Sequence, residues 1–299
     1  MGTISAAERC HRGTTCTTSS AARVVTPREP HRREFALALE LVTPPVPEEA
    51  YRYVSGGIYA EDEAGPYRYD AYLPTAARGQ VPPVVVFVHG DGPAEFLREP
   101  RLWGQYRSWA ALAAANGMAA IAFDHRSSEG RSSIEPVLRQ IQLVLDTVTH
   151  EADALRVDPT RLAVWSGSAG VPFGFVAALD RPSVRCQVVF YGPMDLRTDD
   201  SRMAPGVGAD ALAEHSPITH LERRGGEIQP LFIAKAGLDR PGINASIDAF
   251  VARAAELDAP VTLETHPDGR HAFDILDDDD RSREIIQQAI HFMRTHLTA

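Results

Sequence analysis

A serine in a turn of small residues is the first group in this chain whose type and surroundings could support chemistry. Ser168 lies in the sequence SGSAG (residues 166–170), which follows the apolar run LAVW (162–165) and precedes a segment compatible with a helix. A tight strand-to-helix turn exposes a serine hydroxyl, and a neighbouring base makes it nucleophilic. Such a turn usually reads Gly-x-Ser-x-Gly, and Ser166 replaces the first glycine, where a small side chain is needed. We therefore predict that Ser168 is a nucleophile.

A carboxylate and a histidine follow this serine at the ends of two later apolar runs. Asp239 comes just after the run PLFIAKA (230–236), and His271 lies in a loop after the predicted strand 260–265. Chemistry in α/β sheets is placed where parallel strands end. The order serine, acid, histidine also differs from that of the chymotrypsin and subtilisin folds. The sequence thus predicts a catalytic triad of Ser168, Asp239 and His271.

Other polar residues near strand ends compete for these roles. His266 is closer to its strand than His271 and is the alternative base, and Asp195, after the apolar run 187–191, is the alternative acid. We expect His89 and His125 to hold loops by hydrogen bonds rather than to act as bases. His89 follows an apolar run directly, and His125 follows one after Asp124.

Backbone donors for a negatively charged oxygen are expected after an earlier strand. The continuous apolar run 83–88 is typical of a strand buried on both faces, and it ends in HGDG (89–92). Glycines at a strand end let backbone N–H groups approach a substrate oxygen. The segment resembles the HGGG oxyanion segment of esterases and lipases, with Asp91 in place of the middle glycine. Our candidate donors are the amides of Asp91, Gly92 and Ala169.

Taken together, these segments resemble the α/β-hydrolases, within the group of serine esterases and dienelactone-hydrolase-like proteins. The resemblance spans about residues 50–298 and rests on the ordered stretches VVVFVHGDG (84–92), AAIAFDHR (119–126), RLAVWSGSAG (161–170), SPITHL (216–221), PLFIAKAGLD (230–239) and DGRHAFD (268–274). It implies a mostly parallel central sheet flanked by helices. Dienelactone hydrolases use a cysteine nucleophile, so Ser168 favours the esterases.

The activity implied by this resemblance is hydrolysis of a small carboxylic ester or lactone through an acyl-enzyme, without a cofactor. His271 would take the proton of Ser168, and Asp239 would orient the imidazole. A non-catalytic α/β-hydrolase scaffold used for binding and a peptidase of the prolyl-oligopeptidase type are the alternatives. The chain of 299 residues has no room for a propeller domain, which disfavours the peptidase.

Strands and helices alternate along most of the chain. A hairpin is predicted over 51–60 and 67–73, and helices over 102–116, 134–155 and 281–296. Further strands are predicted at 119–123 and 161–165. The acidic run 277–280 reads as a solvated start of the last helix, where the helix dipole favours negative charge.

Composition limits the partners of the chain. The formal net charge of −10, with no basic stripe to offset it, argues against nucleic acid. No apolar run approaches the length of a membrane span, and no signal-peptide region is evident, so we expect no membrane association and a cytoplasmic location. The spacing of Cys10 and Cys16 matches no zinc motif, and no metal is expected. The expected partner is a small-molecule ester, and a homodimer is compatible with such a chain.

Two segments stand apart from the predicted catalytic domain, residues 35–299. Residues 1–34 are rich in Thr, Ser, Ala and Arg without apolar periodicity, and we interpret them as a flexible extension. Residues 195–228 separate two strands at a point where such folds commonly carry an insertion, which predicts a short cap over the site. No residue set identifies the substrate itself.

Overall fold

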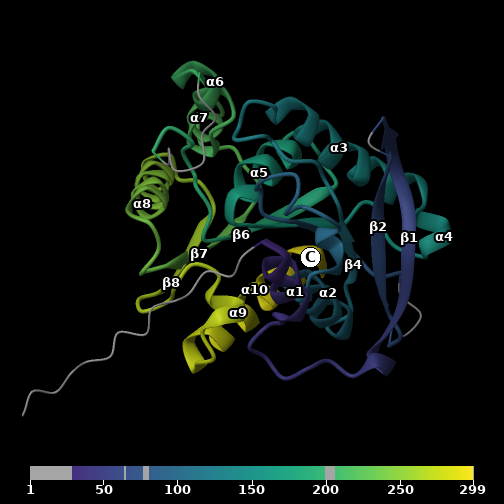
Figure 1. The fold of residues 1–299 in the computed structure, drawn as a ribbon. Coiled ribbons are helices and arrows are strands. Elements are labelled where there is room, and N and C mark those ends of the chain that lie inside the picture. Colours follow the sequence, from purple (N-terminus) through teal and green to yellow (C-terminus); the bar gives the residue numbers. More distant parts are fainter. Residues whose placement is uncertain (1–28, 64, 77–80, 199–205, 299) are drawn as a thin grey trace, which may run out of the picture.

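An eight-stranded sheet forms the centre of the molecule in a computed structural model, which describes residues 29–63, 65–76, 81–198 and 206–298. The strand order is β1-β2-β4-β3-β5-β6-β7-β8, with the hairpin at one edge (Figure 1). The strands are β1 (Tyr51–Asp62), β2 (Gly65–Pro74), β3 (Val84–Val88), β4 (Ala119–Phe123), β5 (Leu162–Gly167), β6 (Val184–Phe190), β7 (Leu231–Ala236) and β8 (Val261–His266).

Most of this sheet is parallel. The β1–β2 and β2–β4 pairs are antiparallel, and every pair from β4 to β8 is parallel. All residues of β3, β4 and β5 are buried, as expected for strands covered by helices on both faces. The carboxyl ends of β5, β7 and β8 therefore lie along one edge of the sheet, and the predicted triad residues follow these three strands.

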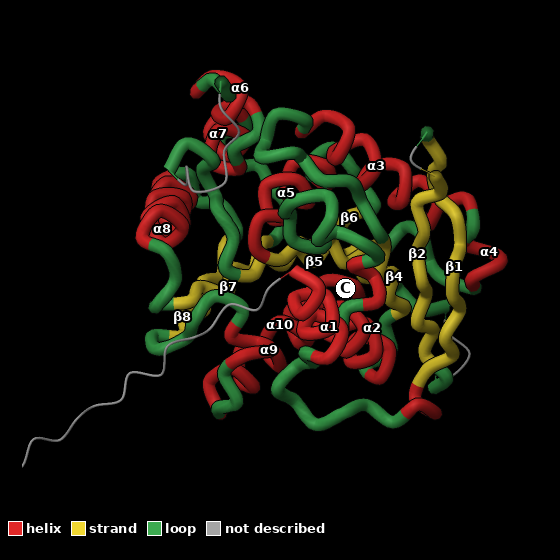
Figure 2. Tube along the Cα trace, viewed as in Figure 1, coloured by secondary structure: helices red, strands yellow, loops and turns green. Residues whose placement is uncertain are grey.

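Helices cover both faces of the sheet (Figure 2). On one face, α2 and α10 pack against Phe87 and Trp165, and on the other, α3 and α5 pack against Val84 and Val86. The longer helices are α1 (Glu29–Ala38), α2 (Gly104–Ala115), α3 (Ile134–His150), α5 (Val171–Ala178), α8 (Pro241–Glu256) and α10 (Asp280–Thr298). The shorter ones are α4 (Ala152–Leu155), α6 (Ala209–Glu214), α7 (Pro217–Arg223) and α9 (Phe273–Leu276).

The predicted strands and the mostly parallel sheet are confirmed, whereas three helical segments differ from expectation. The helix predicted over 134–155 is divided into α3 and α4 at Glu151. Helix α1 crosses the predicted domain boundary at residue 34, while residues 1–28 lie outside the described residues. Helix α8 was not predicted.

The predicted cap segment, residues 195–228, contains α6 and α7, and its residues 199–205 lie outside the described part. Leu221 of α7 is buried in the same cluster as Phe175 of α5 and Phe250 of α8. Helix α7 therefore packs into the body of the domain.

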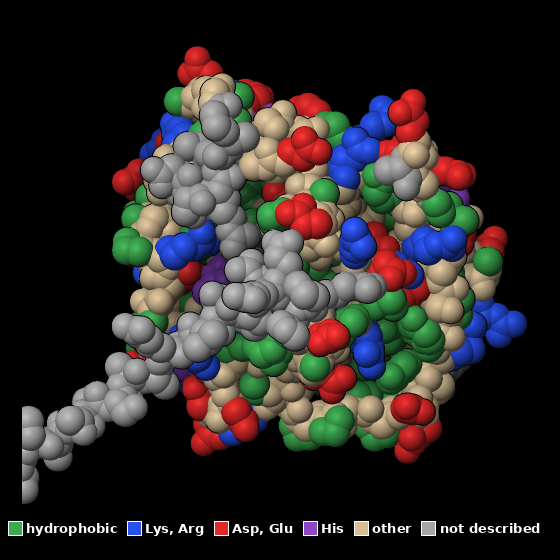
Figure 3. All heavy atoms as spheres, viewed as in Figure 1, with side chains coloured by type: hydrophobic (Ala, Val, Ile, Leu, Met, Phe, Trp, Pro, Cys, Tyr) green, Lys and Arg blue, Asp and Glu red, His purple; other side chains and the backbone are tan. Residues whose placement is uncertain are grey.

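The outer surface carries charges of both signs. Figure 3 shows acidic and basic side chains interspersed over the face drawn, without a continuous basic stripe. No helix among the described residues is both long and apolar enough to cross a membrane.

Candidate active site

The turn around Ser168, residues 166–170, has the strained geometry expected of a nucleophile turn. Strand β5 ends at Gly167, a single 3-10 turn covers Ser168–Gly170, and α5 begins at Val171. Ser168 has a φ of 53°, in the left-handed region that non-glycine residues rarely occupy. A Cβ on Gly170 would overlap the carbonyl oxygen of His89, so only glycine fits this position. The turn thus projects the serine from the end of the strand.

Ser166 stands where the turn pattern has glycine, and its side chain fits because Gly174 of α5 has none. Its side chain is buried, and a Cβ built on Gly174 of α5 would overlap its Oγ. The missing side chain at Gly174 supplies the space that Ser166 fills. The departure from the usual pattern therefore leaves the turn intact.

The structure brings the three predicted triad residues into one hydrogen-bonded chain. Ser168 Oγ lies 2.7 Å from His271 Nε2, and His271 Nδ1 lies 2.7 Å from Asp239 Oδ2. The Asp239 side chain is only 1% exposed, and its Oδ1 accepts a hydrogen bond from the backbone N–H of Arg240 at 2.7 Å. An Nδ1–H donated to this carboxylate leaves Nε2 to accept the serine proton. The arrangement can activate a hydroxyl for attack on a carbonyl carbon.

The alternative base and acid have other partners. His266, at the end of β8, directs its Nε2 to both carboxylate oxygens of Asp279 at 3.1 Å. Asp195 accepts hydrogen bonds from the guanidinium of Arg197 at 2.8 and 2.9 Å. Burial raises the pKa of Asp195, but the hydrogen bonds from Arg197 outweigh burial and lower it. Neither residue joins the chain that contains Ser168.

The predicted oxyanion loop (residues 89–92, called the oxyanion loop below) passes beside Ser168. A Cβ on Gly90 would lie 3.4 Å from the Cβ of Ser168, and the Gly90 N–H donates to the Tyr106 hydroxyl at 2.9 Å. The Asp91 carboxylate accepts hydrogen bonds from the N–H and the hydroxyl of Ser128. The side chain that replaces the middle glycine of the HGGG pattern thus ties this loop to the loop after β4.

Two histidines complete the attachment of the oxyanion loop. The rings of His89 and His125 stack with their centroids 3.5 Å apart, and the His125 N–H donates to His89 Nε2 at 3.0 Å. His89 Nδ1 therefore carries the proton and donates to the carbonyl of Gly90 at 2.8 Å. Burial lowers the pKa of His89 well below its usual value, so this ring stays neutral. Both histidines occupy the loop-holding positions expected from the sequence.

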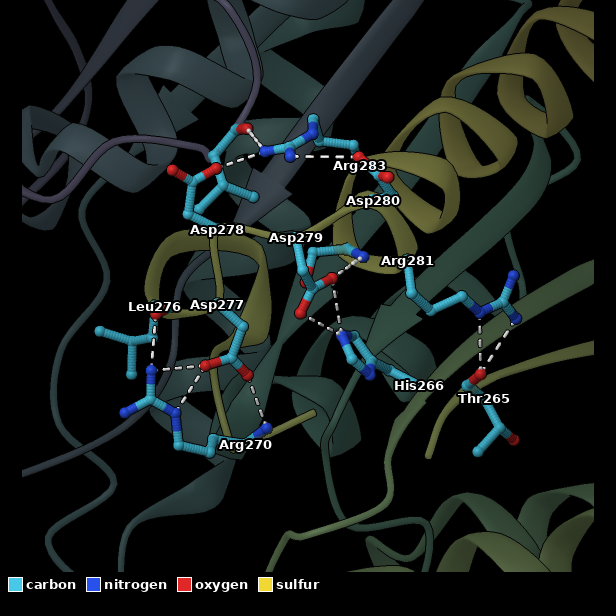
Figure 4. A network of polar contacts seen from close by, with 12 residues as sticks. Thr265, His266, Arg270, Leu276, Asp277, Asp278, Asp279, Asp280, Arg281 and Arg283 are labelled. Carbon is cyan, nitrogen blue, oxygen red and sulfur yellow. Dashed lines mark hydrogen bonds and ion pairs between the residues drawn. The ribbon is translucent and has the colours of Figure 1, made fainter. Parts of the chain in front are cut away.

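The loop of residues 267–277 carries the predicted base His271 and is called the base loop below. Asp277, of the acidic run, holds its two ends together (Figure 4). Asp277 accepts hydrogen bonds from the backbone N–H and the guanidinium of Arg270, and its side chain is only 10% exposed. Asp279 contacts His266 and also accepts the N–H of Ser282 in the first turn of α10. The prediction of a solvated run is therefore wrong for Asp277, because Arg270 covers it, and holds for the exposed Asp278 and Asp280.

The described residues contain no group of three or more His, Cys, Asp or Glu side chains that could hold a metal ion. Cys10 and Cys16 lie outside these residues. Burial raises the pKa of the remaining thiol, Cys186, to about 12, which leaves it unreactive as a nucleophile.

Known structures with this fold include several esterases. A variant of the esterase rPPE superposes with a TM-score of 0.70 at 16% identity, over 89% of this chain and 88% of that chain. A thermophilic esterase of Thermogutta terrifontis with butyrate bound gives 0.64 at 17% identity, over 83% and 95%. A bacterial heroin esterase gives 0.62 at 18% identity, over 83% and 84%. These similarities establish an α/β-hydrolase fold.

The sequence itself matches one protein family. No curated protein matches the chain significantly. The BD-FAE family matches residues 69–221, just over half of the chain, from β2 through the turn around Ser168 to α7. The chain therefore belongs to the BD-FAE family and has the α/β-hydrolase fold.

Proposed function

We propose that this protein is a serine hydrolase that cleaves a small carboxylic ester or lactone. The observation that carries the proposal is the continuous hydrogen-bonded chain from Ser168 through His271 to the buried Asp239. The esterases among the structural neighbours support the same class of reaction, and butyrate bound to one of them favours short acyl chains. The serine at position 168 favours an esterase over a dienelactone hydrolase, which uses a cysteine.

The reaction proceeds through two acyl transfers. His271 Nε2 takes the proton of Ser168 Oγ while the oxygen attacks the carbonyl carbon, and the protonated imidazole then gives that proton to the leaving alcohol. In the second acyl transfer, His271 takes a proton from water while the water oxygen attacks the acyl carbon, and it then gives that proton to Ser168 Oγ as the acid is released. Asp239 holds the imidazole in the tautomer that acts as a base and stabilises its protonated form.

The tetrahedral intermediate requires hydrogen-bond donors for its oxyanion. Our candidates remain the backbone amides of Asp91, Gly92 and Ala169. The amide of Gly90 donates to the Tyr106 hydroxyl, which supports the amides of Asp91 and Gly92 as the donors from this loop. Loss of one such donor lowers the rate by roughly 10²–10³-fold. The segment 195–228 is our candidate for a short cap that limits substrate size.

Hydrolysis of p-nitrophenyl esters from acetate to octanoate tests this function. We expect short-chain turnover by the native protein and a loss of at least about 10⁴-fold in kcat for Ser168→Ala. A fluorophosphonate probe should label Ser168 in the native protein and in Ser132→Ala, an exposed serine variant that serves as the control. A native protein that hydrolyses none of these esters and leaves Ser168 unlabelled would favour the non-catalytic scaffold.

A further inference from the structure

A second buried carboxylate lies three residues after the base. Asp274, in the short helix α9, is fully buried, and all three side chains that donate to it are uncharged. Tyr191 donates its hydroxyl to Oδ1 at 2.7 Å, and Gln105 and Trp109 donate to Oδ2 at 2.8 and 2.9 Å. The triad does not include this carboxylate.

The donors around Asp274 favour its charged form. An indole N–H and an amide NH₂ can only donate, so both require an acceptor. The Tyr191 hydroxyl accepts a hydrogen bond from Gln105 at 2.7 Å and therefore directs its own proton at the carboxylate. Burial raises the pKa of Asp274 above its usual value, and the hydrogen bonds from Tyr191, Gln105 and Trp109 oppose this shift without cancelling it. A protonated carboxyl would place a further donor among these three groups.

This buried cluster (Gln105, Trp109, Tyr191, Asp274) reaches the base by two routes. The ring of Tyr191 packs edge-on against the imidazole of His271, with the centroids 4.9 Å apart. Asp274 also belongs to the same loop, since only Ala272 and Phe273 separate it from the base. One route is a side-chain contact and the other is the backbone.

Each route includes one residue whose strained backbone conformation depends on the contacts around it. Tyr191 has a φ of 38° and Ala272 has a φ of 66°, which are unusual values for residues with a side chain. Such conformations persist where surrounding contacts determine them, and they cost about 1–3 kcal/mol each. The carboxylate that accepts the Tyr191 hydroxyl belongs to Asp274, in the first turn of α9, which begins directly after Ala272.

We propose, on the basis of the hydrolase function proposed above, that Asp274 is a positioning residue for His271. Its carboxylate holds Tyr191 against one face of the imidazole and anchors the backbone that follows the base. The imidazole then keeps the orientation in which Nε2 faces Ser168 and Nδ1 faces Asp239. Asp274 itself touches neither the substrate nor the serine.

A second buried aspartate, Asp70, supplies controls for a test, although its tyrosine partner is half exposed and it also pairs with Arg101. Asp70 of β2 is also fully buried and accepts a tyrosine hydroxyl, that of Tyr53, at 2.9 Å. In the sheet order, β4 and β3 separate β2 from the strand that carries the nucleophile turn. The test variants are Asp274→Asn and Tyr191→Phe, and their controls are Asp70→Asn and Tyr53→Phe. Each is assayed for kcat and KM on p-nitrophenyl acetate, for the rate of fluorophosphonate labelling and for Tm.

We expect Asp274→Asn to lower kcat about 10- to 100-fold and Tyr191→Phe to lower it about threefold to tenfold, with KM within about threefold of the native value. Labelling of Ser168 should slow in parallel, because it needs the same base. The controls should lower Tm and leave kcat within about twofold. A purely structural residue would not lower kcat in this way while KM stays near the native value and while control variants of lowered Tm keep their kcat.

Other results would overturn the proposal. A native-like kcat in a folded Asp274→Asn, or an equal loss of kcat in Asp70→Asn at the same Tm, would remove the positioning role. If Asp274→Asn does not fold, a native-like kcat in Tyr191→Phe would likewise remove the positioning role. The hydrolase function itself fails only if the native protein shows no turnover that depends on Ser168, and the positioning role then fails with it.

Discussion

In the turn around Ser168, a serine in place of the first glycine of the Gly-x-Ser-x-Gly pattern fits because a glycine on the next helix leaves space for it. The glycine position of the pattern holds Ser166, and the side chain that is absent at Gly174 leaves room for it. These residues lie eight positions apart on β5 and α5, so the sequence pattern of the turn alone does not connect them. The order of Ser168, Asp239 and His271 was predictable because each follows an apolar run that forms a strand.

Among residues of one type, sequence reasoning could rank candidates but not place them. His266 is the last residue of β8 and His271 follows the strand, and which of them reaches Ser168 depends on where the base loop turns. In the structure, His266 faces Asp279, whereas His271 faces Ser168. The contact made by the Asp91 side chain was missed for a similar reason, because its partner Ser128 lies on another loop.

The contact between Ser166 and Gly174 predicts that the effect of Gly174→Ala on the free energy of unfolding depends on the residue at position 166. Gly174→Ala alone should lower the free energy of unfolding by about 1–3 kcal/mol, because the new methyl group overlaps Ser166 Oγ. In a Ser166→Gly background the same substitution should be neutral or stabilising by up to about 1 kcal/mol, since alanine favours the helix. Urea unfolding of the four proteins measures both values. An equal cost in both backgrounds would show that Ser166 is not what Gly174 accommodates.

At the scale of elements, the strands were easier to predict than the loops and several helices. Continuous apolar runs identified β3, β4 and β5 because these strands are buried on both faces. Helix α8 was missed although Ile243, Ile247, Phe250 and Ala254 are buried along one side of it. The base loop lacks any periodic signal, because polar contacts such as Arg270 with Asp277 determine its shape.

The contact between Arg270 and Asp277 should affect catalysis more than stability. Arg270 is half exposed, so the ion pair contributes less than about 1 kcal/mol to folding. Its loss nevertheless frees the loop next to His271, and we expect Asp277→Asn to lower kcat about threefold to tenfold with little change in Tm. Asp280→Asn, in the same acidic run but fully exposed, is the control and should keep the native kcat. Equal kcat values for the two variants would argue against a role for this contact.

At the scale of the whole molecule, an N-terminal arm (residues 39–46) connects the two ends of the chain. The Leu41 N–H donates to Ser108 of α2, and the Val42 N–H donates to the carbonyl of Asp274 in the base loop. Arg283 of α10 donates to the carbonyl of Val42. The sequence led us to predict a domain from residue 35, but it did not indicate these contacts, since each joins residues more than 60 positions apart.

The arm should therefore support both stability and catalysis. Two deletions of different length separate its contribution from that of the residues before it. Deletion of residues 1–46 removes the buried Leu41 and the hydrogen bond to Asp274, and we expect it to lower Tm by at least about 5 °C and to reduce kcat. Deletion of residues 1–28 keeps all of these contacts and should leave Tm within about 2 °C, in line with the extension predicted from the sequence. Differential scanning fluorimetry and p-nitrophenyl acetate turnover measure both effects. If the two deletions behave alike, the arm does not stabilise the base loop, and the support for His271 comes from the buried cluster and from Arg270 alone.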